Sequence, residues 1–191
     1  MPVFDHFDFL APFYDRVIQA KPPEGLLSIL DLPADGSLLD AGGGTGRVAQ
    51  WFHGKIREVI ITDLSLKMLV QAQGKNGLVT TNSHSEWLPF SAGYFDRIIM
   101  VDALHHVCDQ QETADELWRV LKPGGRIVIE EPDIRYAGVK LIAVAEKIAL
   151  MRSHFLSPIR IIGLFSGKNA VHRIQNDGPT AWVIIDKPAA F

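Results

Sequence analysis

Cysteine is almost absent from this sequence of 191 residues, in which Cys108 is the only one. A single cysteine excludes a disulfide framework within the chain and any metal site built from a cysteine cluster. The first ten residues, MPVFDHFDFL, have no basic region followed by an apolar run, so they do not resemble a secretory signal. Both features lead us to expect a cytoplasmic protein.

Long hydrophobic runs are also missing. The longest apolar stretch, at 141–151, is interrupted by Glu146 and Lys147 and is shorter than the roughly 20 residues that span a bilayer. A hydrophobic fraction of 47% and a charged fraction of 21% are typical of globular proteins. We therefore predict a single domain over residues 1–191 and no membrane crossing.

The chain has no excess of positive charge, since 19 Lys and Arg residues stand against 22 Asp and Glu residues, for a net charge of -3. This balance argues against a nucleic-acid-binding protein. The charge is uneven, because residues 135–191 carry eight basic and three acidic residues, which gives +5 there and leaves -8 over residues 1–134. The carboxyl-terminal third is thus the cationic part of the chain.

Short apolar runs alternate with segments of helical period over most of the sequence. This alternation predicts an α/β fold, in which crossover helices cover a parallel sheet. The predicted strands are 37–40, 58–62, 78–81, 95–101 and 126–129, the predicted helices are 47–53, 66–73 and 111–121, and a stop at 122–125 separates the last helix from the last strand.

The two ends of the chain depart from this alternation. Helices are predicted at 7–20 and 138–153. Two further strands, 171–175 and 181–186, flank the sequence Asn-Asp-Gly-Pro at 176–179, which favours a tight turn. We therefore predict an antiparallel hairpin added to the sheet, for seven strands in all.

The first predicted strand runs into a glycine loop, Asp40-Ala41-Gly42-Gly43-Gly44-Thr45-Gly46, before a helix. Such a turn lets a ligand approach the backbone closely at the carboxyl edge of a sheet. The glycine spacing does not match the G-x-G-x-x-G of dinucleotide-binding loops. Asp40 would repel a pyrophosphate and attract an amino group or a sulfonium, so the loop favours a zwitterionic or cationic ligand.

Asp63 follows the second predicted strand, 17 residues after Gly46. An acid at about this distance from a glycine loop meets the ribose hydroxyls of nucleotide ligands in such folds. The alternative is a structural role, in which Asp63 or Ser65 caps the helix that begins at Leu66. Both interpretations stay open at this point.

Several segments, in order, carry a resemblance to a known family: residues 38–46, Asp63 with Ser65 and Met68, and the runs EWLPF at 86–90, FD at 95–96, ALHHV at 103–107 and LKPGG at 121–125. Over roughly residues 37–131 the sequence resembles the class I S-adenosylmethionine-dependent methyltransferases. It looks most like the branch with the ubiquinone and menaquinone C-methyltransferases and many small-molecule methyltransferases. The resemblance implies a Rossmann-like, seven-stranded, mostly parallel sheet with helices on both faces, and methyl transfer from S-adenosylmethionine to a small molecule that is hydrophobic or quinone-like.

The same resemblance implies roles for individual residues in binding the cofactor. The methionine end would lie against the glycine loop, the ribose at Asp63, and the adenine face near Leu64 and Met68, while Tyr14, in a segment that resembles the branch's A-x-x-Y-D, would close over the cofactor. At His84 and Ser85 the family often has Asp and Ala, and a neutral imidazole accepts one hydrogen bond whereas an imidazolium accepts none. The implied cofactor-binding residues are Tyr14, Asp40, Ala41, Gly42, Gly44, Asp63, Leu64, Met68, His84, Ser85 and Asp102.

His105 and His106 follow the fourth predicted strand, at the sheet edge where the transferred methyl group would lie. Either is a candidate general base, with at most one expected to face the reaction; the alternative is that the pair orders the loop. The acids that follow the fifth strand, Glu130, Glu131 and Asp133, are expected to be solvated. No second cluster completes a metal site around the two histidines and Cys108, so no metal is expected.

The resemblance also suggests how the domain is divided: an amino-terminal lid at 1–30, a cofactor-binding core at 37–131, and substrate-side helices with the terminal hairpin at 132–191. Residues 138–165 combine a wide apolar face with basic neighbours, which is compatible with a hydrophobic acceptor, a homodimer or peripheral membrane contact, or with burial under the hairpin. The alternatives to a small-molecule methyltransferase are a non-catalytic relative that binds the cofactor and an RNA or protein methyltransferase.

Overall fold

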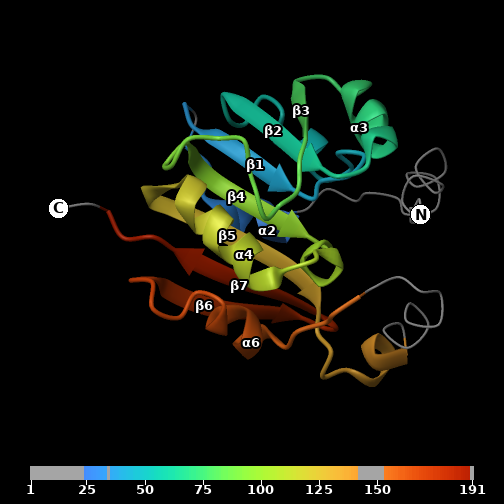
Figure 1. Ribbon diagram of the computed structural model, residues 1–191, viewed down its shortest axis with the longest axis vertical. Coiled ribbons are helices and arrows are strands. Elements are labelled where there is room, and N and C mark those ends of the chain that lie inside the picture. The colour runs from blue at the N-terminus through green and yellow to red at the C-terminus, as the bar shows by residue number, and fades with distance from the viewer. Residues whose placement is uncertain (1–23, 34, 142–152, 190–191) are drawn as a thin grey trace.

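The computed structural model describes residues 24–33, 35–141 and 153–189 (Figure 1). Its centre is a seven-stranded sheet with the strand order β3-β2-β1-β4-β5-β7-β6, which confirms the predicted sheet. The strands are β1 (Ser37–Ala41), β2 (Glu58–Asp63), β3 (Leu78–Asn82), β4 (Phe95–Val101), β5 (Leu121–Pro132), β6 (Val171–Asp177) and β7 (Thr180–Asp186).

Strands β1 to β5 are parallel, whereas β7 pairs antiparallel with both β5 and β6. The predicted antiparallel hairpin is therefore present, and its strand β7 lies between β5 and β6. Parallel strands bring their carboxyl ends to one edge of the sheet, which is on the right in Figure 1. The glycine loop after β1, Asp63 at the end of β2 and the loop after β4 meet at this edge.

The helical segments cover both faces of the sheet, as predicted. They are α2 (Glu24–Leu30), η1 (Ala49–Phe52), α3 (Leu66–Gln73), η2 (Leu104–His106), α4 (Gln110–Val120) and α6 (Pro158–Gly163), where η denotes a 3-10 helix. Successive strand residues alternate between two hydrophobic clusters, because side chains of a strand point to opposite faces. Ile98 and Met100 of β4 pack with α4 and α6, while Ile99 packs with α2, η1 and α3.

Two predicted boundaries are wrong. The helix expected at 47–53 is only the 3-10 helix η1, because His53 turns to an extended conformation and pairs with Ile56. The stop at 122–125 ends α4 but belongs to β5, where it forms an irregularity in the pairing with β4. The backbone of Gly124 donates to the carbonyl of Lys187, so this segment is held by the end of the chain.

Two α-helices of the described structure were not predicted from the sequence, namely α2 and α6. Each has at most seven residues, and each is held by burial of side chains such as Leu30 and Ile161 in the core. The predicted helix at 7–20 lies outside the described residues, and the one at 138–153 is described only over a helical part at 137–141. Within the described residues, no helix is long and apolar enough to cross a membrane.

Candidate functional site

The glycine loop is fixed by backbone hydrogen bonds to the neighbouring strand. The amides of Gly42 and Gly43 donate to the carbonyl of Thr62 at 2.8 and 3.1 Å. Gly44 has a φ of +54°, and a Cβ atom built there would meet only the Asp63 carboxylate, 3.9 Å away. The loop therefore needs glycine at this position for its backbone conformation, and it leaves open space beside the backbone where a ligand can approach.

Asp40 lies beneath this loop and is almost completely buried, with a relative exposure of 1%. Its Oδ2 atom has no hydrogen-bond partner among the described residues. Burial raises the pKa of Asp40 to about 7, and the nearby positive charge of Arg47 opposes this rise. A buried carboxylate oxygen without a partner is costly, so it is suited to receive a cationic or hydrogen-bond-donating group of a ligand.

Asp63 connects the glycine loop to the helix that follows β2. Its Oδ2 atom accepts a hydrogen bond from the Gly44 amide at 2.9 Å, and its Oδ1 atom accepts one from the Ser65 amide at 2.8 Å. The helix cap is Ser65, whose hydroxyl accepts from the Met68 amide. Of the two residues considered for the helix cap, Ser65 is the one that caps α3. Asp63 lies instead at the open side of the glycine loop.

Asp102 forms an ion pair that sequence reasoning missed. Its Oδ2 atom accepts a hydrogen bond from Arg47 at 2.8 Å, which joins the loop after β4 to the segment after the glycine loop. Asp102 also has a φ of +52°, an uncommon conformation for a residue other than glycine. Such conformations gather at functional sites. The signal available in the sequence was an arginine directly after the last glycine of the loop.

The residues expected at the adenine end are spread around the start of α3 and the segment after β3. Leu64 is 54% exposed, whereas Met68 is buried. The rings of His84 and Trp87 have centroids 5.6 Å apart, and Trp87 is largely exposed. Ser85 is half-buried between them.

Glu86 is buried next to these residues and joins them to the histidine loop. Its Oε1 atom accepts hydrogen bonds from the amides of Cys108 and Asp109. The segment after β3 is thereby tied to the loop that follows η2. Sequence reasoning quoted Glu86 only as part of a motif and did not assign it this contact.

His105 and His106 lie in η2, and their rings contact each other, with centroids 4.0 Å apart. The 3-10 turn places the two rings side by side. The Nδ1 atom of His105 lies 2.5 Å from an oxygen of Glu131, and the other oxygen of Glu131 accepts from the Leu104 amide at 2.8 Å. His105 also stacks on Phe155, with ring centroids 4.2 Å apart. A carboxylate on Nδ1 fixes the orientation of an imidazole.

The two histidines differ in their environment. Burial, and then the charge of His105, lower the pKa of His106 to about 3, and its Nδ1 atom lies 3.3 Å from the Ser153 hydroxyl. A histidine with so low a pKa stays neutral and is a weak proton acceptor at neutral pH. Of the pair, His105 with its carboxylate partner has the arrangement that suits a general base.

The three acids expected after the fifth strand are not solvated, contrary to expectation; Glu130 and Glu131 belong to β5, and Asp133 follows it. Glu131 and Asp133 are buried, the first against His105 and the second paired with Arg135. Glu130 accepts a hydrogen bond from the Trp182 indole at 2.7 Å, and burial raises its pKa. The sequence placed these acids at the correct edge of the sheet, but the partners of Glu130 and Glu131 come from another strand and another loop.

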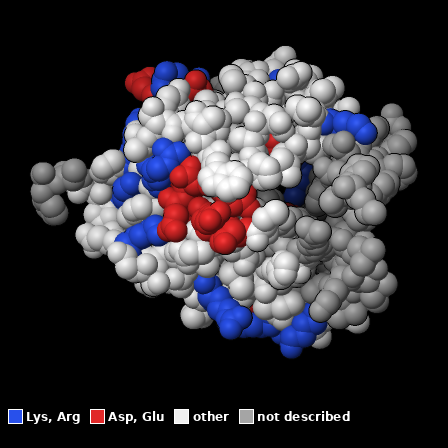
Figure 2. All heavy atoms as spheres, in the orientation of Figure 1, with Lys and Arg blue, Asp and Glu red and all other residues white. Residues whose placement is uncertain are grey.

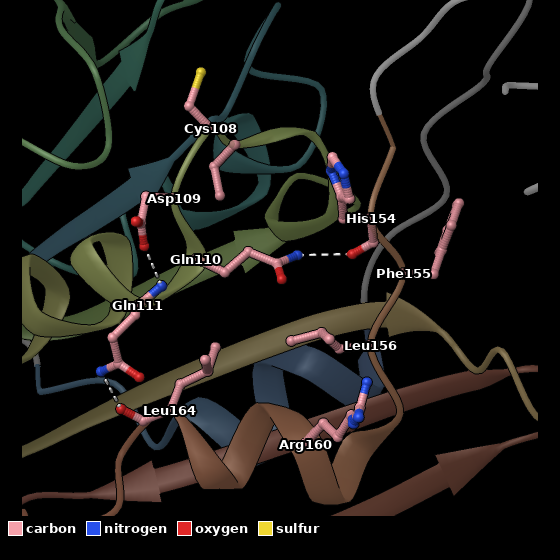
Figure 3. A pocket seen from close by; sticks show the side chains of 10 residues that line it. Cys108, Asp109, Gln110, Gln111, His154, Phe155, Leu156, Arg160 and Leu164 are labelled. Atoms are coloured by element: carbon pink, nitrogen blue, oxygen red, sulfur yellow. Dashed lines mark hydrogen bonds between the residues drawn. The ribbon is translucent and has the colours of Figure 1, made fainter.

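A cavity of about 660 Å³ lies between the start of α4 and α6 (Figure 3). Hydrogen bonds between distant segments hold its walls together. The side-chain amide of Gln110 donates to the backbone carbonyls of Leu104 and His154, and the side-chain amide of Gln111 donates to the backbone carbonyl of Leu164. The lining residues are Val107, Cys108, Asp109, Gln110, Gln111, His154, Phe155, Leu156, Arg160 and Leu164. Apart from the histidine loop next to it, no feature of the sequence predicted this cavity.

Tyr14 lies outside the described residues, so its predicted place over the cofactor stays a prediction. Over the part of the chain that the structure describes, no group of three or more His, Cys, Asp or Glu side chains could hold a metal ion.

Comparison with known sequences finds a family whose profile matches the central part of the chain. The profile of the family described as "Methyltransferase domain" matches residues 39–129, just under half of the chain. The ubiquinone/menaquinone biosynthesis C-methyltransferase UbiE of Edwardsiella ictaluri is 36% identical over 104 residues, which cover 49% of this chain and 41% of that protein. The chain therefore spans less than half the length of the curated relatives that it matches.

Solved structures of low sequence identity share the fold. A chain of the complex between the Haloferax volcanii Trm112 methyltransferase activator and a methyltransferase superposes with a TM-score of 0.82 at 17% identity, over 97% of this chain and 99% of that one. The geranyl diphosphate C-methyltransferase of Streptomyces coelicolor A3(2) gives a TM-score of 0.74 at 17% identity, over 100% of this chain and 86% of that one. The strand order, the glycine loop and the match over residues 39–129 agree, so the chain has the fold of the class I S-adenosylmethionine-dependent methyltransferases and resembles that family over its central part.

Proposed function

We propose that this chain catalyses transfer of the methyl group of S-adenosylmethionine to a small, hydrophobic acceptor. The observation that carries the proposal is the buried Asp40 carboxylate, whose Oδ2 atom has no described partner, beneath a glycine loop that is open at Gly44. An ammonium or sulfonium ligand would complete such a site, whereas a pyrophosphate would be repelled by it. The residues present therefore fit S-adenosylmethionine.

The cofactor would be held by residues from three strand ends. Asp40, with Ala41 and the loop Gly42 to Gly46, would hold the methionine end, and Asp63 would accept hydrogen bonds from the ribose hydroxyls. The proposed adenine contacts are Leu64, Met68, His84 and Ser85. Asp102, fixed by Arg47, would close the site on the β4 side.

The cofactor supplies an activated methyl group, so the protein has mainly to align the acceptor and exclude water. The loop after β4 is suited to this task because Glu131 fixes Leu104 and His105 at the sheet edge. Where the acceptor loses a proton, the imidazole of His105 would take it, with Glu131 as its positioning residue. His106 stays neutral, because burial lowers its pKa to about 3.

The acceptor class is supported by two observations. The curated relatives are named as ubiquinone/menaquinone biosynthesis C-methyltransferases, and one structural relative is named as a geranyl diphosphate C-methyltransferase. In this chain, the cavity next to the histidine loop has an apolar wall formed by Val107, Phe155, Leu156 and Leu164. A hydrophobic or quinone-like acceptor matches such a wall.

Calorimetry with S-adenosylmethionine and S-adenosylhomocysteine tests the first step, and formation of S-adenosylhomocysteine with a panel of quinols, phenols, prenyl alcohols and polar amines tests the second. We expect binding of both nucleosides, turnover with acceptors that have an apolar body, and no turnover with the polar amines. Binding without turnover on any acceptor would indicate a non-catalytic relative, and absence of binding would contradict the proposal.

A further inference from the structure

One permanently charged side chain that lines the cavity between α4 and α6 forms no ion pair with another described residue. Arg160 lies on α6 and lines the cavity, and Figure 3 shows its side chain rising from the helix toward Leu156. Its guanidinium has no hydrogen bond or ion pair to another described residue. Every other described arginine has such a partner; these are Arg47, Arg57, Arg97, Arg119, Arg126, Arg135 and Arg173.

The glutamine and aspartate side chains of the cavity wall are already engaged in the fold. The side-chain amide groups of Gln110 and Gln111 donate to backbone carbonyls, as described above. Asp109 caps α4, because its Oδ1 atom accepts from the amides of Gln111 and Glu112. In Figure 3, Asp109 lies on the opposite side of the cavity from Arg160. Arg160 is therefore the permanently charged group of the wall that a ligand in this cavity can pair with.

The surrounding surface favours the same sign of ligand charge. In Figure 2, basic side chains gather along the lower rim of the molecule, where Figure 1 shows α6 and β6, and acidic side chains gather over α4. Residues 135–191 carry the positive charge of the chain, with eight basic and three acidic residues. Such a field raises the local concentration of anions at the α6 side of the cavity.

The cavity also adjoins the proposed reaction site. Its wall begins at Val107, directly after η2, and Phe155 of the wall stacks on His105. The carbonyl of His105 accepts a hydrogen bond from the His154 amide at 2.7 Å, so the two segments are held together. A volume of about 660 Å³ is in the range of small-molecule sites.

We propose that this cavity is the acceptor pocket and that it selects an acceptor with an apolar body and an anionic group, a carboxylate or a phosphate, which pairs with Arg160. The proposal rests on the proposed function, since it names the acceptor class of that reaction. The apolar body would lie against Phe155, Leu156 and Leu164, and the anion would point toward α6, away from Asp109. A guanidinium pairs with carboxylates and phosphates through two parallel hydrogen bonds.

The test compares three probes that share one apolar body: 4-phenylbutyrate, 4-phenylbutyl phosphate and the neutral 4-phenylbutan-1-ol. Amide chemical shifts of the full chain would be followed in NMR titrations of each probe. We expect both anions to bind about 10-fold or more tightly than the alcohol, with shifts at 107–111 and 154–164. The relative affinities for the carboxylate probe and the phosphate probe show which of the two anionic groups the pocket prefers.

Variants assign the preference to one side chain. Arg160→Gln should lower the affinity for the anions about 10-fold or more and leave binding of the alcohol unchanged, whereas Arg160→Lys should retain part of the preference. Arg173→Gln is the matched control, because it removes one positive charge from the same region outside the cavity wall, and it should leave all three affinities unchanged. Equal binding of alcohol and anions, shifts that map elsewhere, or an equal effect of Arg160→Gln and Arg173→Gln would overturn the proposal.

Calorimetry with S-adenosylhomocysteine on the same samples separates the two proposals. If the nucleoside binds and the probes show no preference for the anion, the acceptor class is wrong and the proposed function stands. If the probes bind as expected but the nucleoside does not, the proposed function fails, and with it the assignment of this cavity as an acceptor pocket. Arg160→Gln should leave binding of S-adenosylhomocysteine unchanged, since Arg160 does not contact the glycine loop.

Discussion

The glycine-loop region and the histidine-loop region lie at the same edge of the sheet, but they are built in different ways. The first joins the ends of neighbouring strands, and its contacts, from Gly44 to Asp63 for example, stay within the β1–β2 unit. The second joins β5, η2 and residues 153–155, which lie far apart in the chain, through Glu131, His105 and Phe155. The difference predicts that one region can lose its acid and remain folded, whereas the other depends on its acid for stability.

The largest expected effect is therefore in the histidine region. Glu131→Ala would leave the buried His105 ring and the Leu104 amide without their acceptor, and we expect a loss of about 3 kcal/mol in the free energy of unfolding. Urea unfolding followed by circular dichroism measures it. Glu131→Gln, which keeps an acceptor for the Leu104 amide, should lose less. A change below about 0.5 kcal/mol in Glu131→Ala would show that the two regions do not differ in this respect.

The two regions should also respond to pH in opposite directions. The pKa of Asp40 is raised from 3.8 to about 7, so its contribution to stability is fully present below about pH 4 and is lost as the pH rises through 7. The pKa of His106 is lowered from 6.5 to about 3, so its contribution is present above pH 6.5 and is lost as the pH falls toward 3.

Asp40→Asn separates these two contributions. Relative to the parent protein, the variant should gain about 2 kcal/mol in the free energy of unfolding between pH 5 and pH 7, because over this range Asp40 of the parent is ionised in the unfolded state but stays largely protonated in the folded state. Urea unfolding at several pH values measures the difference. Parallel stability curves for the two proteins would contradict the raised pKa of Asp40.

For binding of the cofactor, the larger effects are expected in the glycine-loop region and not in the histidine-loop region. Asp40→Asn and Asp63→Ala should each weaken binding of S-adenosylhomocysteine by about 2 kcal/mol, the usual effect of losing a charge-assisted hydrogen bond. Glu131→Gln should leave this affinity unchanged, since Glu131 belongs to the histidine region. Isothermal titration calorimetry gives all three values. Parent-like affinity in both aspartate variants would show that the glycine loop does not hold the cofactor.

The smallest effect is expected at the link between the two regions. Arg47→Met removes the ion pair with Asp102 and the positive charge that opposes the raised pKa of Asp40. We expect binding of S-adenosylhomocysteine at pH 7 to weaken by about 1 kcal/mol, because more of Asp40 is protonated. The loss should shrink at pH 8.5, where Asp40 is ionised in both proteins. A loss that is equal at both pH values would mean that Arg47 acts only through Asp102.

Local patterns in the sequence predicted the strands and the glycine loop well. Helix α3 occupies the predicted residues 66–73, because Ser65 supplies its cap and Leu69 and Ala72 supply its buried face. The helix predicted at 47–53 failed because its end is decided by the pairing of His53 with Ile56. The short helix α6 was missed because Ile161 and Phe165 hold it in a core formed mainly by other elements.

The candidate site also has one part that the sequence predicted and one part that depends on tertiary contacts. Asp40, Asp63 and the glycines follow their strands directly, so the alternation of strand and loop was enough to place them at the carboxyl edge of the sheet. The burial of Glu131 and the free guanidinium of Arg160 in its cavity could not be foreseen, since both depend on segments that are brought together by the strand order β4-β5-β7 and by the packing of α6.

The sequence by itself determined the class of fold, the place of the glycine loop and the methyltransferase family that residues 39–129 match. Each of these follows from short-range features, namely apolar runs of strand length, turn residues and the order of motifs. Only the tertiary structure decided which acids are buried, which histidine is paired with a carboxylate, and where a cavity opens beside it. The physical reason is that burial and pairing are properties of side chains that meet across the sheet edge, and the distance between them in the chain carries no information about that contact.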